Sequence, residues 1–309
     1  MRQPTHHIAN KPAGSYAGKL RAAKRLPRSN IVTAKSNIDY LATVERTMRI
    51  VEHLSDARNG LSVSEIARFL DVNKSIAFRI LATLETLHYI YQDPVTQLYR
   101  LTYRISNLAL RQLANSRILD QCVAPLRALA ERSGELVRLA VIENDRPVWI
   151  HSESGVQRRL QVAPTYGLDI SLHSHATAKA WLFTLPDEEV ERLIGHKRLK
   201  DYTKHTITTL RALKGDLAEA RQRGFALSYE EHELGVGTVA APIIVENVNG
   251  TPLCVGVVSL AAPVSRMDRV QFIQAGHQVV EATHLLAEVW PSDMAPQRLG
   301  HSPASKRLR

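Results

Sequence analysis

The chain has 309 residues, of which 40 are Lys or Arg and 30 are Asp or Glu, so its formal net charge is +10. This length favours two domains, and 44% hydrophobic with 23% charged residues is ordinary for a globular protein, which excludes wholesale disorder and collagen-like repetition. No apolar stretch approaches the roughly 18 residues of a transmembrane helix, and no apolar segment of a secretory signal follows the basic N-terminus. Cys122 and Cys254 are too few for a disulfide framework, so we expect a cytoplasmic protein.

The positive charge is concentrated at the two ends of the chain. Residues 1–38 carry eight Lys or Arg and no Asp or Glu, and residues 291–309 carry four basic residues and one acidic residue. Residues 1–38 are rich in Pro, Gly, Ser and Asn without helical or strand periodicity, which predicts a basic disordered arm, and 291–309 is predicted to be a disordered tail. Such an arm can bind nucleic acid or an anionic membrane surface, or it can simply keep the chain soluble.

Residues 39–103 have the pattern of a small helical unit. A first helix is predicted from residue 40 to residue 54, with one apolar stripe made of Leu41, Val44, Met48, Val51 and Leu54. Ser62 and Glu65 match the capping box that begins a short second helix, and Asn73 is the expected N-cap of a third helix.

The third predicted helix, residues 74–87, has two different faces. The face expected to be buried carries Ile76, Ile80, Leu84 and Leu87. The opposite, polar and partly basic face carries Ser75, Phe78, Arg79, Ala82, Thr83 and Thr86. Two β-favouring runs, 89–92 and 98–101, follow around a turn sequence. Helices in this order followed by a hairpin predict a winged helix-turn-helix.

This layout predicts contacts with double-stranded promoter DNA. Arg79 can pair with guanine in the major groove, Lys74 and Ser75 can hold phosphates, and Arg100 in the hairpin can reach the backbone or the minor groove. The full set of candidate DNA contacts is Ser64, Asn73, Lys74, Ser75, Phe78, Arg79, Thr83 and Arg100. A polar face with one Arg is also typical of an ordinary solvated surface, and Phe78 could instead be a core residue.

The rest of the chain predicts a linker helix over 104–118 and a mixed domain over 119–290. Helices are expected over 121–132, 176–185, 188–194, 210–223 and 267–289, and strands over 136–143, 148–152, 160–163, 170–172, 225–229, 239–245 and 254–261. Strands and helices mixed without regular β-α-β alternation favour an α+β domain on an antiparallel sheet. Cys254 is expected to be a buried small apolar residue.

Several stretches, taken in their order, carry a family resemblance. In the first unit they are Leu61-Ser62, Glu65-Ile66-Ala67, Asn73-Lys74-Ser75, Arg79-Ile80-Leu81-Ala82-Thr83-Leu84 and Tyr99-Arg100-Leu101. In the second they are Leu172-His173-Ser174-His175-Ala176-Thr177-Ala178-Lys179-Ala180, Thr203 with Thr206-Ile207-Thr208, Arg223-Gly224-Phe225-Ala226, Glu230-Glu231, Gly235-Val236, Val239-Ala240-Ala241-Pro242 and Val258-Ser259-Leu260-Ala261-Ala262-Pro263. Over about residues 40–290 the chain resembles the IclR-type transcriptional regulators.

The resemblance implies a winged helix-turn-helix, a linker helix and a GAF-like domain that binds a small organic acid effector. It also implies dimers, often paired into tetramers, on promoter DNA. The effector-binding residues carried over by motif are Ala176, Thr177, Ser228, Thr238, Ser259 and Ala261. Hydroxyl groups and backbone N–H groups at a helix start can hold a carboxylate without a buried Arg.

The chain departs from the family pattern at three places. It has Ala176-Thr177-Ala178 where Gly is frequent, Ala261 where a second Ser is common, and His88 where Gly usually ends the recognition helix. The first two changes narrow the pocket or remove a hydroxyl group. The effector of the best-known members therefore cannot be transferred to this chain.

No motif points to catalysis or to a cofactor. His173 and His175 are two residues apart, a spacing that on a strand would put both on one face, so they could be zinc ligands. Without cysteine ligands or a metalloprotease motif they are better explained as structural histidines, and no metal is expected. A nucleophile elbow, a phosphate loop and a dinucleotide fingerprint are all missing. We therefore expect a regulator and not an enzyme. The alternative is a small-acid-binding enzyme or carrier with a nucleic-acid-binding appendage.

Overall fold

A computed structural model describes residues 41–155, 160–164, 167, 169–195, 198–247 and 249–291. The chain divides into two compact units, one that ends at Thr102 and one that begins at Tyr103. The predicted basic arm (1–38) and all but the first residue of the predicted tail (291–309) lie outside the described residues.

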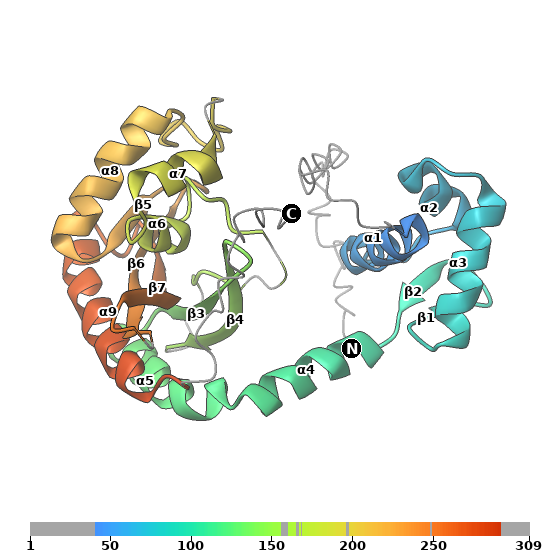
Figure 1. Cartoon of the computed structure of the whole chain (residues 1–309), viewed down its shortest axis with the longest axis horizontal. Helices are drawn as coiled ribbons and strands as arrows, with labels where there is room; N and C mark the ends of the chain where they lie inside the picture. The colour runs from blue at the N-terminus through green and yellow to red at the C-terminus, as the bar shows by residue number, and fades with distance from the viewer. Residues whose placement is uncertain are drawn as a thin grey trace, which may run out of the picture. The chain divides into compact units, whose positions relative to one another are not determined.

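Unit 1 is a winged helix-turn-helix, as predicted (Figure 1). Its elements are α1 (Ala42–Asp56), α2 (Val63–Leu70), α3 (Lys74–Thr86) and an antiparallel hairpin of β1 (Ile90–Gln92) and β2 (Tyr99–Leu101). Both predicted caps are confirmed. Ser62 and Glu65 form a reciprocal capping box, and the Asn73 side chain accepts a hydrogen bond from the backbone N–H of Ile76 at 3.0 Å. These local bonds determine where the two helices begin.

The predicted apolar stripe of α1 is only partly buried. Leu54 is buried, but Leu41, Val44 and Met48 are 69%, 57% and 55% exposed. Ile50, which was not assigned to the stripe, is fully buried. The contacts of α1 are with α2 and β2, and the buried positions lie in its C-terminal half, so the first two turns present their apolar residues outward.

The buried face of α3 also differs from the prediction. Ile80 and Leu84 are buried as expected, together with Ala77 and Leu81. Leu87 lies one residue beyond the helix and is 51% exposed, so its prediction as a core residue is wrong, and Ile76 is only partly buried.

Unit 2 is an α+β domain, as predicted. It begins with α4 (Arg104–Ser116), which has no buried residue, and α5 (Ile118–Ser133). Its five-stranded antiparallel sheet has the order β4-β3-β7-β6-β5. The strands are β3 (Leu136–Glu143), β4 (Arg146–Ser154), β5 (Ala226–Tyr229), β6 (Val236–Glu246) and β7 (Pro252–Pro263), and the remaining helices are α6 (Ala176–Leu182), α7 (Asp187–Ile194), α8 (Leu210–Arg223) and α9 (Arg269–Val289).

Two predicted strands of unit 2 are wrong, and one predicted helix is too long. Residues 160–163 are irregular, and residues 170–172 lead into the turn before α6 without pairing to any strand. Ile170 buries its side chain without joining the sheet, which explains its strand-like apolarity. The helix that begins at Ala176 ends at Leu182, three residues earlier than predicted.

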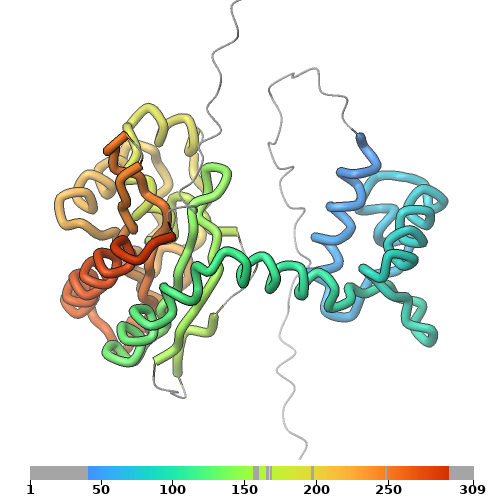
Figure 2. The backbone as a smooth tube through the Cα atoms, turned by 60° about the horizontal axis from the view of Figure 1, so that its bottom comes forward, coloured from blue at the N-terminus to red at the C-terminus, as the bar shows by residue number. Residues whose placement is uncertain are grey.

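Different helices cover the two faces of this sheet. α5 and α9 pack on one face, and α6, with α8 beside it, packs on the other (Figure 1). The backbone trace shows β3 and β4, in light green, as neighbouring strands (Figure 2). Side chains alternate between the two faces along each strand. The face toward α5 and α9 is apolar, whereas the face toward α6 also carries polar residues.

Candidate functional site

The outer face of α3 is open to solvent. Ser75, Phe78, Arg79 and Thr83 are all exposed, and Phe78 is 55% exposed, so the alternative that it belongs to the core is wrong. Among the described residues, no carboxylate forms an ion pair with Arg79. An exposed guanidinium without an acidic partner is free to donate to an external acceptor.

The N-terminus of α3 and the hairpin provide polar groups beside this face. The Asn73 side chain also accepts from the Ser75 hydroxyl at 2.8 Å, so capping already uses the oxygen of Asn73 and the proton of Ser75. Lys74 is exposed, whereas Ser64 and Arg100 are partly buried. Hydrogen bonds from the backbone N–H groups of residues 95 and 96 lower the pKa of Asp93 and hold the turn of the hairpin.

The candidate effector residues on the sheet share one face. Ser228 of β5 is in register with Thr238 of β6, which is in register with Ala261 of β7. Ser259 lies two residues before Ala261 and therefore points to the same side. Its neighbour in register, Ala240, packs in the apolar cluster that includes α6. The structure thus brings these residues together opposite α6.

The other two candidates, Ala176 and Thr177, begin α6 and are buried. The Ser228 hydroxyl donates to the backbone carbonyl of Ser174 at 2.7 Å. In contrast, the hydroxyls of Thr177 and Ser259 are buried without a hydrogen-bond partner among the described residues. Leaving a buried hydroxyl unpaired costs about 1–3 kcal/mol, and α6 contacts the strand that carries Ser259. Two such groups on contacting elements indicate a site that an external molecule can complete.

A buried cation that no motif predicted lies on this same face. Arg138 of β3 is in register with Ser259 and is only 7% exposed. Its guanidinium carbon lies 4.0 Å from the centroid of the Trp149 ring, and burial lowers its pKa to about 10. The signal was present in the sequence, because Arg138 is the one charged residue in the apolar run 136–142.

The two histidines that were weighed as zinc ligands, His173 and His175, have other partners, as expected of structural histidines. His173 Nε2 lies 2.8 Å from the backbone carbonyl of Lys200, and His175 Nδ1 accepts from the backbone N–H of Ser171 at 3.1 Å. Over the part of the chain that the structure describes, no group of three or more His, Cys, Asp or Glu could hold a metal ion. Burial, together with the nearby His232 and Arg138, lowers the pKa of His175 to about 3, so the ring is neutral at pH 7.

The depressed pKa of His175 predicts a loss of stability in acid. In the unfolded chain His175 takes up a proton near pH 6.5, whereas in the folded chain it stays neutral until about pH 3. The contribution of His175 to the free energy of unfolding is therefore lost as the pH falls below 6.5. Between pH 7 and pH 5 we expect this residue alone to lower the free energy of unfolding by about 2 kcal/mol. Urea unfolding of the wild type and of His175→Asn at both pH values measures the difference. An unchanged pH dependence in the variant would assign the acid sensitivity to other groups.

A buried cluster of charged groups connects α6 to α8, to β5 and to the loop after β5. The fully buried Nζ of Lys179 donates to Asp216 at 2.9 Å, to the backbone carbonyl of Leu227 at 3.1 Å and to Glu231 at 2.7 Å. Burial raises the pKa of Glu231, although Lys179 opposes this shift. All three protons of the ammonium group are therefore used, and the cluster has no free donor for a ligand.

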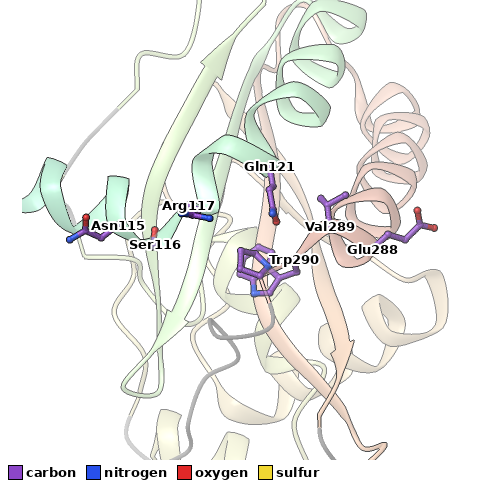
Figure 3. Close-up of a pocket in the computed structure, with 8 residues that line it drawn as sticks. Asn115, Ser116, Arg117, Gln121, Glu288, Val289 and Trp290 are labelled. Atoms are coloured by element: carbon purple, nitrogen blue, oxygen red, sulfur yellow. The ribbon is translucent and has the colours of Figure 1, made fainter.

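An open pocket of about 700 Å³ lies elsewhere in unit 2. Figure 3 shows Arg117 and Gln121, beside the start of α5, together with Val289 and Trp290 at the end of α9. None of the candidate effector residues lines it. The polar face under α6 and this pocket are separate features, and only the former concentrates unpartnered buried hydroxyls.

A winged helix-turn-helix with an exposed polar recognition helix defines a DNA-binding protein. Comparison with known families gives the particular class. The profile described as "IclR helix-turn-helix domain" matches residues 43–94, and the profile described as "Bacterial transcriptional regulator IclR C-terminal" matches residues 110–285. The chain belongs to the IclR family of bacterial transcriptional regulators, and it is a regulator and not an enzyme.

Individual relatives agree with this assignment. The chain is 29% identical to the HTH-type transcriptional repressor AllR of Klebsiella pneumoniae over 238 residues, which cover 77% of this chain and 86% of AllR. It is similar in fold to the IclR transcriptional regulator of Alicyclobacillus acidocaldarius, with a TM-score of 0.70, 24% identity and coverage of 81% and 98% of the two chains. An IclR homolog from Microbacterium hydrocarbonoxydans, solved in complex with 4-hydroxybenzoate, has a TM-score of 0.65, 20% identity and coverage of 80% and 98%. No helix among the described residues is long and apolar enough to cross a membrane.

Proposed function

We propose that this protein is a cytoplasmic regulator whose affinity for its operator depends on a small carboxylic acid bound between α6 and the sheet of unit 2. The observation that carries the proposal is the pair of buried, unpartnered hydroxyls of Thr177 and Ser259 on contacting elements. The 4-hydroxybenzoate held by the Microbacterium homolog supports a carboxylate effector, and the name of the AllR relatives supports repression.

The DNA-binding role is proposed for the eight residues predicted from the sequence. Arg79, with Phe78 and Thr83 on the same exposed face, would meet base edges in the major groove. Ser64, Asn73, Lys74, Ser75 and Arg100 would contact phosphates or the minor groove and position the helix. The basic arm, residues 1–38, would add affinity that depends on salt and not on sequence.

The response to the acid is proposed to act through self-association. The exposed apolar residues Leu41, just before α1, Val44 and Met48 of α1 and Leu110 of α4 support a dimer, which can pair into a tetramer. An effector that binds one arrangement of the subunits more tightly shifts the population toward it and changes the spacing of the recognition helices.

Removing the hydroxyl of Thr177 tests the effector site. A screen of carboxylic acids by thermal shift supplies the effector, and selection from random duplex DNA supplies an operator. In Thr177→Val we expect unchanged operator affinity without the acid and a roughly 10-fold higher acid concentration for half-maximal response, because one hydrogen bond to a charged group is lost.

Thr184→Val is the matched control, since the hydroxyl of Thr184 donates to the backbone carbonyl of Trp181 at 2.7 Å and is not a candidate ligand. Equal responses of the wild type and Thr177→Val would remove Thr177 from the site. Release of a chemically altered acid would favour the alternative of an enzyme.

A further inference from the structure

Arg138 is a buried cation for which the described residues supply no carboxylate. It is 7% exposed, its Nε has no hydrogen-bond partner, and no described ion pair includes it. The other buried Lys or Arg of the described residues, Lys179, is paired with Asp216 and Glu231. Burial alone lowers the pKa of Arg138, and at about 10 the guanidinium is still charged at pH 7.

The surroundings of Arg138 leave only part of its guanidinium available. The Trp149 ring, 4.0 Å from the guanidinium carbon, covers one side of the group. Ser259 lies beside it on the neighbouring strand, in register, with an unpartnered hydroxyl. The indole Nε1 of Trp149 is also buried without a partner. The unpartnered groups next to Arg138 can all donate hydrogen bonds, so an acceptor-rich anion would satisfy them together.

Burying a charge without a partner destabilises a protein strongly, and most buried charges are paired. Arg138 lies on the sheet face that carries Ser228, Thr238 and Ser259, the face assigned to the effector under the proposed function. An unpaired buried charge, which lowers the free energy of unfolding, is expected at a functional site where a bound ligand of opposite charge compensates for it. An arginine suits this role because its planar fork pairs with a carboxylate through two parallel hydrogen bonds.

We propose that the guanidinium of Arg138 binds the carboxylate of the effector, with the hydroxyl of Ser259 as a second donor to the same group. This inference rests on the proposed function and goes beyond it, because the carboxylate is anchored by a buried charge on β3 and not only by hydroxyls and the start of α6. It also explains why the short α6, which has seven residues, need not provide the charge that holds the anion.

The charges near Arg138 also select the kind of acid. Arg138 can neutralise one carboxylate. The next buried cation, Lys179, already has two carboxylate partners and no free proton. A second carboxylate on the ligand would therefore find no other buried cation that is free to pair with it. The site is specific for monocarboxylates over dicarboxylates.

The test compares acids with their neutral amides on the full chain. The probes are 4-hydroxybenzoate and propionate, each beside its carboxamide, and succinate as a dicarboxylate. The proteins are the wild type, Arg138→Met, Arg138→Lys and the control Arg146→Met, which removes an exposed arginine of β4. The readouts are the melting temperature with and without each probe and operator binding without any probe.

We expect at least one monocarboxylate to raise the melting temperature of the wild type and of Arg146→Met, while its amide and succinate do not. Arg138→Met should lose this shift, should bind operator DNA normally and should melt at or above the wild-type temperature without a ligand, since an unpaired buried charge is gone. Arg138→Lys keeps the charge without the planar fork and should need at least 10-fold more acid.

Two results would overturn the inference. Equal acid-induced shifts in the wild type and Arg138→Met would leave the proposed effector function intact but remove Arg138 from the site. A ligand-free Arg138→Met that melts several degrees below the wild type would show that Arg138 is a structural residue, whatever the acids do. A wild type that responds to no acid would instead contradict the proposed function, and the ligand-free melting temperatures would then decide the role of Arg138.

Discussion

Lys179→Met is expected to lower the free energy of unfolding of unit 2 by about 3–5 kcal/mol at pH 7. The substitution replaces a fully buried ammonium group by a thioether of similar size and leaves Asp216 and Glu231 without their cation. It also removes the hydrogen bond to the backbone carbonyl of Leu227. All three tryptophans, Trp149, Trp181 and Trp290, lie in unit 2, so urea unfolding followed by tryptophan fluorescence reports on this unit.

Two further variants test whether the burial of the charges causes the loss of stability in Lys179→Met. Lys214 also contacts two carboxylates, those of Asp187 at 3.0 Å and Glu191 at 2.6 Å, but its side chain is 29% exposed. Lys214→Met should therefore destabilise unit 2 far less than Lys179→Met. The triple variant Lys179→Met, Asp216→Asn, Glu231→Gln should recover much of the lost stability, because no buried charge then remains unpaired. A single-variant loss of less than 1 kcal/mol would show that water reaches the cluster.

The pH dependence of the Lys179 effect has a definite sign. The pKa of Glu231 is raised in the folded protein, so the folded state holds its proton to a higher pH than the unfolded state. Loss of Lys179 removes the cation that opposes this shift and raises the pKa of Glu231 further. The penalty of Lys179→Met therefore becomes smaller as the pH falls below 7 and Glu231 takes up a proton.

The features that the sequence predicted correctly depend on short-range bonds. The capping box joins Ser62 and Glu65, three residues apart, and the Asn73 cap reaches only to Ile76. Residue types at such spacing determine the hydrogen bonds almost alone. The helix-turn-helix could therefore be predicted from local patterns, and so could the alternation that places Ser259 and Ala261 on one face of β7.

The burial of whole faces could not be predicted in the same way. Helical periodicity groups Val44 and Met48 with Leu54, yet of these three only Leu54 is buried. Which part of an apolar stripe is covered depends on the length and position of the partner elements, and these contacts are long-range. The strand prediction for Ile170 failed for a related reason, because apolarity records burial and not backbone pairing.

The pairing of the buried charges at the candidate site also depends on long-range contacts that the sequence does not reveal. The sequence places Arg138 in an apolar strand and Lys179 in an alanine-rich helix, but it does not show which of them has acidic partners. Asp216 and Glu231, which pair with Lys179, are 37 and 52 residues away along the chain. Only the fold shows that Lys179 has carboxylate partners and that Arg138 has none among the described residues. Lys179 is therefore a structural cation, whereas Arg138 is a candidate ligand-binding one.

Arg79→Ala is expected to weaken binding to a selected operator by about 10- to 100-fold and to relax the preference for one guanine. The guanidinium of Arg79 stands on the exposed face of α3 without a described carboxylate partner, so it is available for a bidentate contact with a guanine edge. The affinity for the operator and for single-base variants of it, measured by fluorescence anisotropy at one salt concentration, gives both quantities. Unit 1 should remain folded, because Arg79 contributes nothing to its apolar core.

Lys74→Ala is the matched control for this prediction. Lys74 is exposed at the first position of α3, where a cation is expected to contact phosphate. Its removal should weaken binding to all sequences alike and reduce the slope of log affinity against log salt by about 1. The contrast between the two variants separates base reading from phosphate contact. If Arg79→Ala also weakens binding to every sequence equally, Arg79 is a phosphate contact and sequence preference must come from another residue of this exposed face, with Phe78 and Thr83 the first to replace.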